Sequence, residues 1–356
     1  MTAELRSDLD AIPAYVPGRS VPGAIKLASN ESPGGPLPGV VEAITAAAAG
    51  VSRYPDNAAV ALTSVIAEKI GVPAANVVAG CGSVALCQQL VQITCAAGDE
   101  VVFSWRSFEA YPVVTRVAGA TPVPVPNTAE HGHDLDAMAA AIGERTRLVF
   151  VCTPNNPTGT TISATEIGKF LDKVPERVLV VVDEAYVEYG DADDPDRVDG
   201  ISLAMERPNV ITLRTFSKAY ALAGVRVGYA VGNSAAIVAL RKVSIPFSVN
   251  AAAQAAAIAA LGAADVMRER AAVVVAERER VTGLLREAGY AVPSSRGNFV
   301  WLPLGEDTAA FTADAADNGL LVRGYGTDGV RVTIGHADEN DALIAFARTR
   351  AAARAV

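Results

Sequence analysis

The chain is poor in the residues that build metal centres, disulfide frameworks and nucleic-acid-binding surfaces. Its 356 residues include three histidines and four cysteines, with no C-x-x-C pair and no metal-ligand spacing. We therefore expect no metal site, and free thiols in a cytoplasmic protein. Lys and Arg number 30 against 39 Asp and Glu, a net charge of −9, and the basic residues are scattered. This charge balance argues against a nucleic-acid partner.

Long apolar runs are also missing. The most apolar stretch, residues 251–266, is mostly alanine and is interrupted by Gln254 and Asp265, so it predicts a packed helix and not a membrane span. The first residues, MTAELRSDLD, lack the basic and apolar segments of a secretory signal. With 51% hydrophobic and 19% charged residues, the chain is too apolar to be disordered and is long enough to bury a sizeable core.

Short β-branched runs alternate with helical patterns between residues 77 and 232, which indicates βα units in a parallel sheet. Several runs are apolar at consecutive positions, so we expect both faces of the sheet to be buried under helices. The predicted strands are Val101–Ser104, Thr121–Val125, Leu148–Cys152, Val178–Val182, Val210–Leu213 and Val227–Val231.

The pattern differs at the two ends of the chain and predicts three parts. Residues 1–40 are rich in proline and glycine and read as an N-terminal arm. Residues 41–248 form the large domain. Residues 249–356 form a smaller α+β domain, with one long Ala-rich helix to about Arg280 and short strands at Phe299–Leu302 and Val330–Ile334.

Two glycine-containing turns stand where such a sheet would bind a ligand. Gly82 and Ser83 directly precede a helical stretch, and small residues there leave backbone N–H groups free to approach an anion. A predicted strand also runs into the segment NNPTG, whose turn leaves the side chain of Asn156 to point into the crevice. An ordinary helix cap and an ordinary turn are the alternatives.

Two further strands end in charged residues. Val178–Val182 is followed by Asp183, which needs a cation or hydrogen-bond donors if it is buried. Val210–Leu213 leads to Lys218, with Arg226 eight residues later, an arrangement that suits a desolvated amine beside a phosphate. A structural salt bridge and a surface lysine are the alternatives. All four signals fall at the carboxyl ends of strands or at the start of the next helix, so they converge on one ligand site.

The segments NNPTG, DEAY and SKAYALAGVRVGY, in this order, resemble the fold-type I pyridoxal-phosphate-dependent aminotransferases over nearly the whole chain. The resemblance implies an α/β fold, with a mostly parallel sheet covered by helices on both faces in a large cofactor-binding domain, plus a smaller α+β domain. It implies that Lys218 binds pyridoxal 5′-phosphate covalently and then moves the substrate α-proton, while Asp183 pairs with the pyridine nitrogen. The remaining implied cofactor contacts are Asn156 and Tyr186 to the ring hydroxyl oxygen, and Gly82, Ser83, Thr215, Ser217 and Arg226 to the phosphate.

The stretches LASNESPGG, SRYPD, SVNAAAQAA and GVRVTIG are similar to the histidinol-phosphate and aromatic aminotransferase branch of that family. By this similarity Arg331 binds the substrate carboxylate, with Arg323 near the same anion. Tyr54 would reach the cofactor phosphate of the other subunit in a homodimer with shared active sites. Phe108 stands where members of the branch commonly carry a tyrosine that stacks on the cofactor, so stacking is kept and a hydroxyl is lost.

We expect an aromatic amino acid aminotransferase that uses 2-oxoglutarate as acceptor. The segment around Tyr15 looks closer to the aromatic enzymes, and Tyr15 and Phe247 would supply aromatic walls for the substrate ring. A histidinol-phosphate aminotransferase of histidine biosynthesis is the alternative, because two arginines facing one dianion would favour a phosphate substrate. A lyase or decarboxylase on the same scaffold is the nearest rival with another enzyme activity, and a ligand-sensing regulator is a rival of another class.

Overall fold

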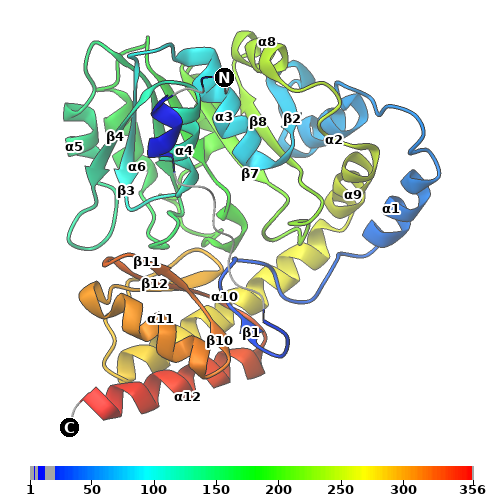
Figure 1. Cartoon of the computed structure of the whole chain (residues 1–356). Helices are drawn as coiled ribbons and strands as arrows, with labels where there is room; N and C mark the ends of the chain where they lie inside the picture. Colours follow the sequence, from blue (N-terminus) through cyan, green and yellow to red (C-terminus); the bar gives the residue numbers. More distant parts are fainter. Residues whose placement is uncertain (1–3, 5–6, 13–20, 355–356) are drawn as a thin grey trace.

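The computed structural model describes residue 4, residues 7–12 and residues 21–354. Figure 1 shows a larger upper part built on one sheet and a smaller lower part, with helix α10 running from one to the other. The helices of the upper part are α1 (Val40–Ala48), α2 (Val60–Ile70), α3 (Gly82–Thr94), α4 (Ala110–Val117), α5 (Leu135–Ala140), α6 (Ala164–Leu171), α7 (Gly200–Glu206), α8 (Ser234–Val243) and α9 (Ala251–Gly262).

The upper sheet has seven strands in the order β2-β8-β7-β6-β5-β3-β4. Strand β8 is antiparallel to both of its neighbours, and the other pairings are parallel. The predicted mostly parallel α/β sheet is therefore confirmed. Its strands are β2 (Val77–Gly80), β3 (Glu100–Trp105), β4 (Thr121–Pro126), β5 (Thr146–Cys152), β6 (Leu179–Asp183), β7 (Val210–Thr215) and β8 (Gly228–Gly232).

Both faces of this sheet are buried, as the consecutive apolar residues predicted. On β5, Phe150 packs into a cluster that includes residues of α3, α4 and α8. Its neighbours Val149 and Val151 pack into a second cluster that includes residues of α5, α6 and α7. Successive side chains of a strand point to opposite faces, so Asp183 lies on the face of Phe150, and Arg214 lies on the opposite face from Leu213.

The lower part contains a three-stranded antiparallel sheet in the order β11-β12-β9. A separate parallel pair joins β1 of the predicted arm to β10, with Ile25 opposite Leu320. The strands are β1 (Ile25–Lys26), β9 (Phe299–Leu302), β10 (Leu320–Leu321), β11 (Arg323–Tyr325) and β12 (Gly329–Thr333), and the helices are α10 (Ala264–Glu287), α11 (Thr308–Asp317) and α12 (Ala337–Arg354). Short 3₁₀ turns lie at Ser7–Ala11 (η1), Ala74–Asn76 (η2), Val187–Tyr189 (η3) and Gly305–Asp307 (η4).

The prediction of one long Ala-rich helix is wrong. The chain leaves helical geometry at Ala263 (φ −100°, ψ 27°), directly after Gly262, a residue that weakens a helix because it lacks a Cβ atom. Helix α9 consequently packs on α1 in the upper part, while α10 crosses to the lower part.

In the described ranges, no helix is both long and apolar enough to cross a membrane, and no group of three or more His, Cys, Asp or Glu could hold a metal ion.

Candidate active site

A cavity of about 240 Å³ lies at the carboxyl ends of the upper strands, closed from below by β11 and β12. It brings together most of the site residues predicted from the sequence. Those that line it are Ser83, Phe108, Asn156, Asp183, Tyr186, Thr215, Ser217, Lys218, Arg226, Arg323 and Arg331, together with Ala28, Ser29, Val84, Cys152 and Ala185.

Asp183 is the last residue of β6 and is 3% exposed. The hydroxyl of Tyr111 donates to its Oδ2 over 2.8 Å, and the backbone N–H of Ala185 donates to its Oδ1 over 3.2 Å. Burial raises the pKa of Asp183 to about 6, although the hydrogen bond from Tyr111 opposes this rise. A buried carboxylate of this kind is stabilised by any cation that enters the cavity.

Tyr111 is a site residue that sequence reasoning missed. Its ring stacks on Phe150, with centroids 4.3 Å apart, and meets Phe108 edge-on at 5.5 Å. A tyrosine on the buried face of an amphipathic helix needs a hydrogen-bond partner for its hydroxyl. The sequence could therefore have predicted that the hydroxyl of Tyr111 makes a hydrogen bond, but not that Asp183 accepts it.

Lys218 follows the end of β7, and its ammonium lies 5.5 Å from the ring centre of Tyr186. Its Nζ donates to the backbone carbonyl of Asn30 over 3.2 Å. Burial lowers the pKa of Lys218 to about 7, and the positive charge of Arg331 adds to this effect. A large share of the amine is thus neutral, and therefore nucleophilic, near pH 7.

Asn30 is a second site residue that sequence reasoning missed, although it belongs to the stretch LASNESPGG. Its Nδ2 donates to the hydroxyl of Tyr186 over 2.9 Å, and the hydroxyl of Thr333 donates to its Oδ1 over 3.0 Å. Its backbone N–H donates in turn to the hydroxyl of Thr333. Asn30 thus joins the arm, the upper sheet and the lower sheet directly beside Lys218.

One corner of the cavity is suited to an anion. Helix α3 begins at Gly82 (φ 74°) with no side chain capping it, so its first N–H groups are available to a ligand. The φ of Gly82 is one that residues with a side chain rarely adopt, and a Cβ atom there would lie 2.6 Å from a terminal nitrogen of Arg226, so a larger residue would be strained and would displace this guanidinium. The guanidinium of Arg226 in turn donates to the hydroxyl of Ser217 over 3.4 Å.

The opposite end of the cavity carries two arginines that face each other across the lower sheet. Arg323 of β11 is in register with Arg331 of β12. The two terminal nitrogens of Arg331 donate to Asn156 Oδ1 and to the carbonyl of Ala28, each over 2.6 Å. Its Nε is buried and has no hydrogen-bond acceptor in the part of the chain that the structure describes. A bound carboxylate would supply that acceptor.

Among the described residues, Gly82, Tyr54 and Phe247 are predicted residues that do not line this cavity, although Gly82 directly precedes the lining residue Ser83. Tyr54 is 83% exposed and stacks on Phe247 with ring centres 4.5 Å apart. Phe247 therefore forms no wall of the cavity in its own chain. Tyr15 lies outside the described residues.

The residues present fit pyridoxal phosphate. The buried carboxylate of Asp183 suits a protonated pyridine nitrogen, and the corner formed by Gly82, Ser217 and Arg226 suits a phosphate. Lys218 lies on the same cavity with a depressed pKa, as a lysine that must attack an aldehyde requires.

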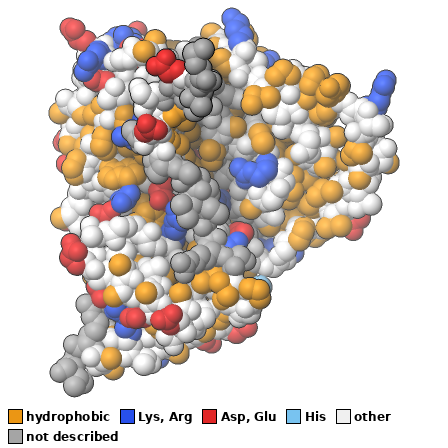
Figure 2. All heavy atoms as spheres, viewed as in Figure 1, with side chains coloured by type: hydrophobic (Ala, Val, Ile, Leu, Met, Phe, Trp, Pro, Cys, Tyr) orange, Lys and Arg blue, Asp and Glu red, His pale blue; other side chains and the backbone are white. Residues whose placement is uncertain are grey.

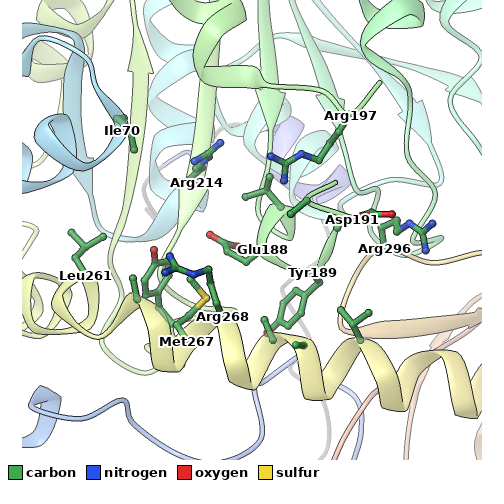
Figure 3. Close-up of a pocket in the computed structure, with 18 of the residues that line it drawn as sticks. Ile70, Glu188, Tyr189, Asp191, Arg197, Arg214, Leu261, Met267, Arg268 and Arg296 are labelled. Carbon is green, nitrogen blue, oxygen red and sulfur yellow. The ribbon is translucent and has the colours of Figure 1, made fainter. Parts of the chain in front are cut away.

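A larger cavity, about 890 Å³, lies between α10 and the other face of the upper sheet. Figure 3 shows Glu188, Arg197 and Arg214 on the sheet side and Met267 and Arg268 on the helix side. Several of its charges are paired within the chain, since Arg214 contacts Glu184 at 2.8 Å and Arg278 contacts Glu279 at 2.9 Å, and none of the predicted site residues lines it. Glu188 is an exception, because its Oε2 is buried and has no partner within the described part of the chain.

Comparison with known proteins agrees with this geometry. The family model "Aminotransferase class I and II" matches residues 22–346. A protein of Rhodococcus jostii (strain RHA1), named aromatic amino acid aminotransferase, is 62% identical over 98% of this chain and 96% of its own length. One of the same name from Mycobacterium bovis (strain BCG / Pasteur 1173P2) is 55% identical over 98% of each chain.

Among solved structures, the histidinol-phosphate aminotransferase from Sinorhizobium meliloti in complex with pyridoxal-5′-phosphate superposes with a TM-score of 0.90. It is 30% identical and covers 99% of each chain. The chain therefore belongs to the class I and II aminotransferases and is a pyridoxal-phosphate enzyme.

Proposed function

We propose that this enzyme is an aromatic amino acid aminotransferase, which moves an amino group between phenylalanine, tyrosine or tryptophan and a 2-oxo acid such as 2-oxoglutarate. The observation that carries the proposal is the 62% identity to a relative of that name, which extends over nearly the full length of both chains. Histidinol-phosphate aminotransferase stays the second candidate, because Arg323 and Arg331 face the same end of the cavity and a structure of that name superposes closely.

The proposal gives each residue of the cavity a role. Lys218 holds the cofactor covalently, Asp183 keeps its pyridine nitrogen protonated, and Phe108 contacts the ring face. Bound pyridoxal phosphate supplies an electron sink for the electrons released when the substrate loses its α-proton. The proposed contacts to the ring hydroxyl oxygen are Asn156 and Tyr186, and those to the phosphate are Gly82, Ser83, Thr215, Ser217, Arg226 and, from a second subunit, Tyr54.

Proton transfer falls to Lys218. Its Nζ has a pKa of about 7 in this chain, so it can accept a proton from the substrate Cα atom and release it again near neutral pH. The carbonyl of Asn30 orients that nitrogen. At the other end, Arg331 binds the substrate carboxylate through its guanidinium, whose Nε has no acceptor among the residues that the structure describes.

A homodimer is part of the same proposal. Several large hydrophobic side chains near α1, α2 and the turn before α9 are exposed, and Figure 2 shows hydrophobic side chains gathered over this region. They are Val41, Val51, Tyr54, Val60, Ile245 and Phe247. A second copy of the chain would cover them and bring Tyr54 to the partner's cavity. Sedimentation that gives a fully active 36.7 kDa monomer would contradict this assembly.

We place the enzyme in the cytoplasm, and its four free cysteines support that assignment.

The experiment that tests the activity is a panel of amino-group donors with 2-oxoglutarate, read as formation of glutamate. We expect phenylalanine, tyrosine and tryptophan to give the largest kcat/KM. A tenfold or larger advantage for histidinol phosphate would replace the proposal with the second candidate.

A further inference from the structure

The carboxylate of Glu109 lies beside the substrate end of the active-site cavity. Glu109 precedes α4 as its N-cap residue, but its side chain makes no capping hydrogen bond. Instead, both of its carboxylate oxygens accept from a terminal nitrogen of Arg323, at 3.1 and 3.4 Å. The two side chains are 38% and 20% exposed, so the pair is partly shielded from water.

This pairing makes the two facing arginines electrostatically unequal. Arg323 has an anionic partner, whereas the terminal nitrogens of Arg331 donate to two neutral oxygen atoms, those of Asn156 and Ala28. A substrate anion at this end is therefore attracted by the uncompensated charge of Arg331. The charge of Arg323 attracts it less, because Glu109 already compensates that charge.

The other charged and titratable groups nearby do not alter this difference. Arg106 is paired with Asp328. The ring of Tyr325 lies within 6 Å of the guanidinium carbons of Arg323 and Arg331, and burial raises the pKa of its hydroxyl, so it stays neutral. Glu109 is thus a negative charge, held against Arg323, that a second charge on the substrate would meet at this end of the cavity.

We propose that Glu109 is a specificity-determining residue that, by pairing with Arg323, tunes the anion subsite to a singly charged carboxylate and against a doubly charged phosphate. The inference rests on the proposed function and names the reason for its substrate choice. An aromatic amino acid brings one negative charge to this end, whereas a phosphate monoester brings between one and a half and two near pH 7. Repulsion from Glu109 therefore acts about twice as strongly on the phosphate.

The test is the ratio of kcat/KM for histidinol phosphate to that for phenylalanine, with 2-oxoglutarate as acceptor, in the wild type and in Glu109→Gln. Suppose that removing the carboxylate of Glu109 raises kcat/KM about fivefold for a substrate with one negative charge at this end. For a substrate with two negative charges kcat/KM then rises about twenty-five-fold, so the ratio of the two constants rises about fivefold. Both constants come from one preparation, so a loss of folded protein cancels in the ratio.

Two variants separate charge from structure. Glu109→Asp keeps the charge and should keep the wild-type ratio. Glu100→Gln removes a carboxylate at the start of β3 that is paired with Arg145 in a similar way, away from the cavity, and should also leave the ratio unchanged. The increase in Glu109→Gln should shrink at pH 5.5, where a phosphate monoester is mainly singly charged because its second pKa is about 6.

The outcomes are distinguishable. If the wild type prefers phenylalanine but the ratio in Glu109→Gln stays within twofold of the wild-type ratio, the role of Glu109 is wrong and the proposed function stands. If the ratio rises equally in Glu100→Gln, the role is also wrong. A wild type that prefers histidinol phosphate tenfold would overturn the proposed function itself.

Discussion

The cavity at the carboxyl ends of the seven-stranded sheet and the cavity beside α10 differ in how their polar groups are balanced. The active-site cavity is the smaller, about 240 Å³ against about 890 Å³. It collects unlike groups from distant segments, among them Lys218, Asp183 and Arg331, and the Nε of Arg331 has no acceptor among the described residues. In the cavity beside α10, Arg214 is held by Glu184, and Arg278 by the carbonyls of Tyr189 and Gly297.

Neighbouring residues of one strand end show the same difference. Asp183 points to the active-site cavity and has a raised pKa, because the effect of burial exceeds that of the hydrogen bonds from its neutral donors. Glu184, the next residue, accepts from Arg214 and from the backbone N–H of Gly200 on the other side. The comparison teaches that a reactive site is recognised by converging, incompletely satisfied groups and not by its volume.

The largest difference between the cavities should come from their lysines. Lys218→Ala should remove the visible absorbance of the bound cofactor and lower transamination by at least about a thousandfold, since the cofactor attachment and the proton carrier are both lost. Lys69→Ala, at the larger cavity, removes an amine that donates to the carbonyl of Leu261. That variant should keep its absorbance and its kcat within twofold, and similar losses in both variants would remove the distinction.

The adjacent carboxylates should separate activity from stability. Asp183→Asn should lower kcat about a hundredfold, because the pyridine nitrogen loses its anionic partner, with little change in unfolding free energy. Glu184→Gln should leave kcat nearly unchanged and lower the free energy of unfolding by about 2–3 kcal/mol, because it leaves Arg214 without a charged partner. Steady-state rates and urea unfolding of both variants check this, and equal effects on activity would contradict it.

Tyr111 should set the acid limit of cofactor binding. Because the pKa of Asp183 is about 6, cofactor affinity should fall as the pH drops through that value and the carboxylate is protonated. Tyr111→Phe removes a hydrogen bond to the charged form and should move this midpoint upward by about one pH unit. Cofactor dissociation constants measured between pH 5 and pH 8 give the midpoint for each protein. The same midpoint in the wild type and in Tyr111→Phe would show that Tyr111 contributes packing and does not affect the pKa of Asp183.

The smallest effect should come from the unpartnered carboxyl of the larger cavity. Burial raises the pKa of Glu188 to about 7. Its stabilising contribution is therefore complete below the unfolded pKa of about 4.3 and is lost as the pH rises through about 7. When the pH is raised from 5 to 8, the free energy of unfolding of Glu188→Gln, measured with urea, should therefore rise by about 1–2 kcal/mol relative to that of the wild type. A difference that does not change with pH would show that the carboxyl is solvated.

The sequence predicted the part of the site that follows directly from strand ends. Asp183 and Lys218 each continue an apolar strand, and parallel topology brings such ends to one edge. Tyr111 and Asn30 were not predictable in this way. Their partners, Asp183 and Tyr186, are 72 and 156 residues away, so only the folded chain defines the contact.

The fold shows a similar limit. The long apolar strands were predicted within a residue or two, because burial on both faces leaves a continuous pattern. Strands β10 and β11 have two and three residues, too few for an alternating pattern to appear. The pairing of Glu109 with Arg323 spans 214 residues and carries no local signal at all.

The most direct test of the account is the position of the cofactor. The holoenzyme is treated with borohydride, which makes a lysine–cofactor bond permanent, then digested and analysed by mass spectrometry. We predict that the peptide carrying Lys218 gains the mass of the reduced cofactor. Modification of another lysine in its place, such as Lys69 at the larger cavity, would contradict the assignment of the active site.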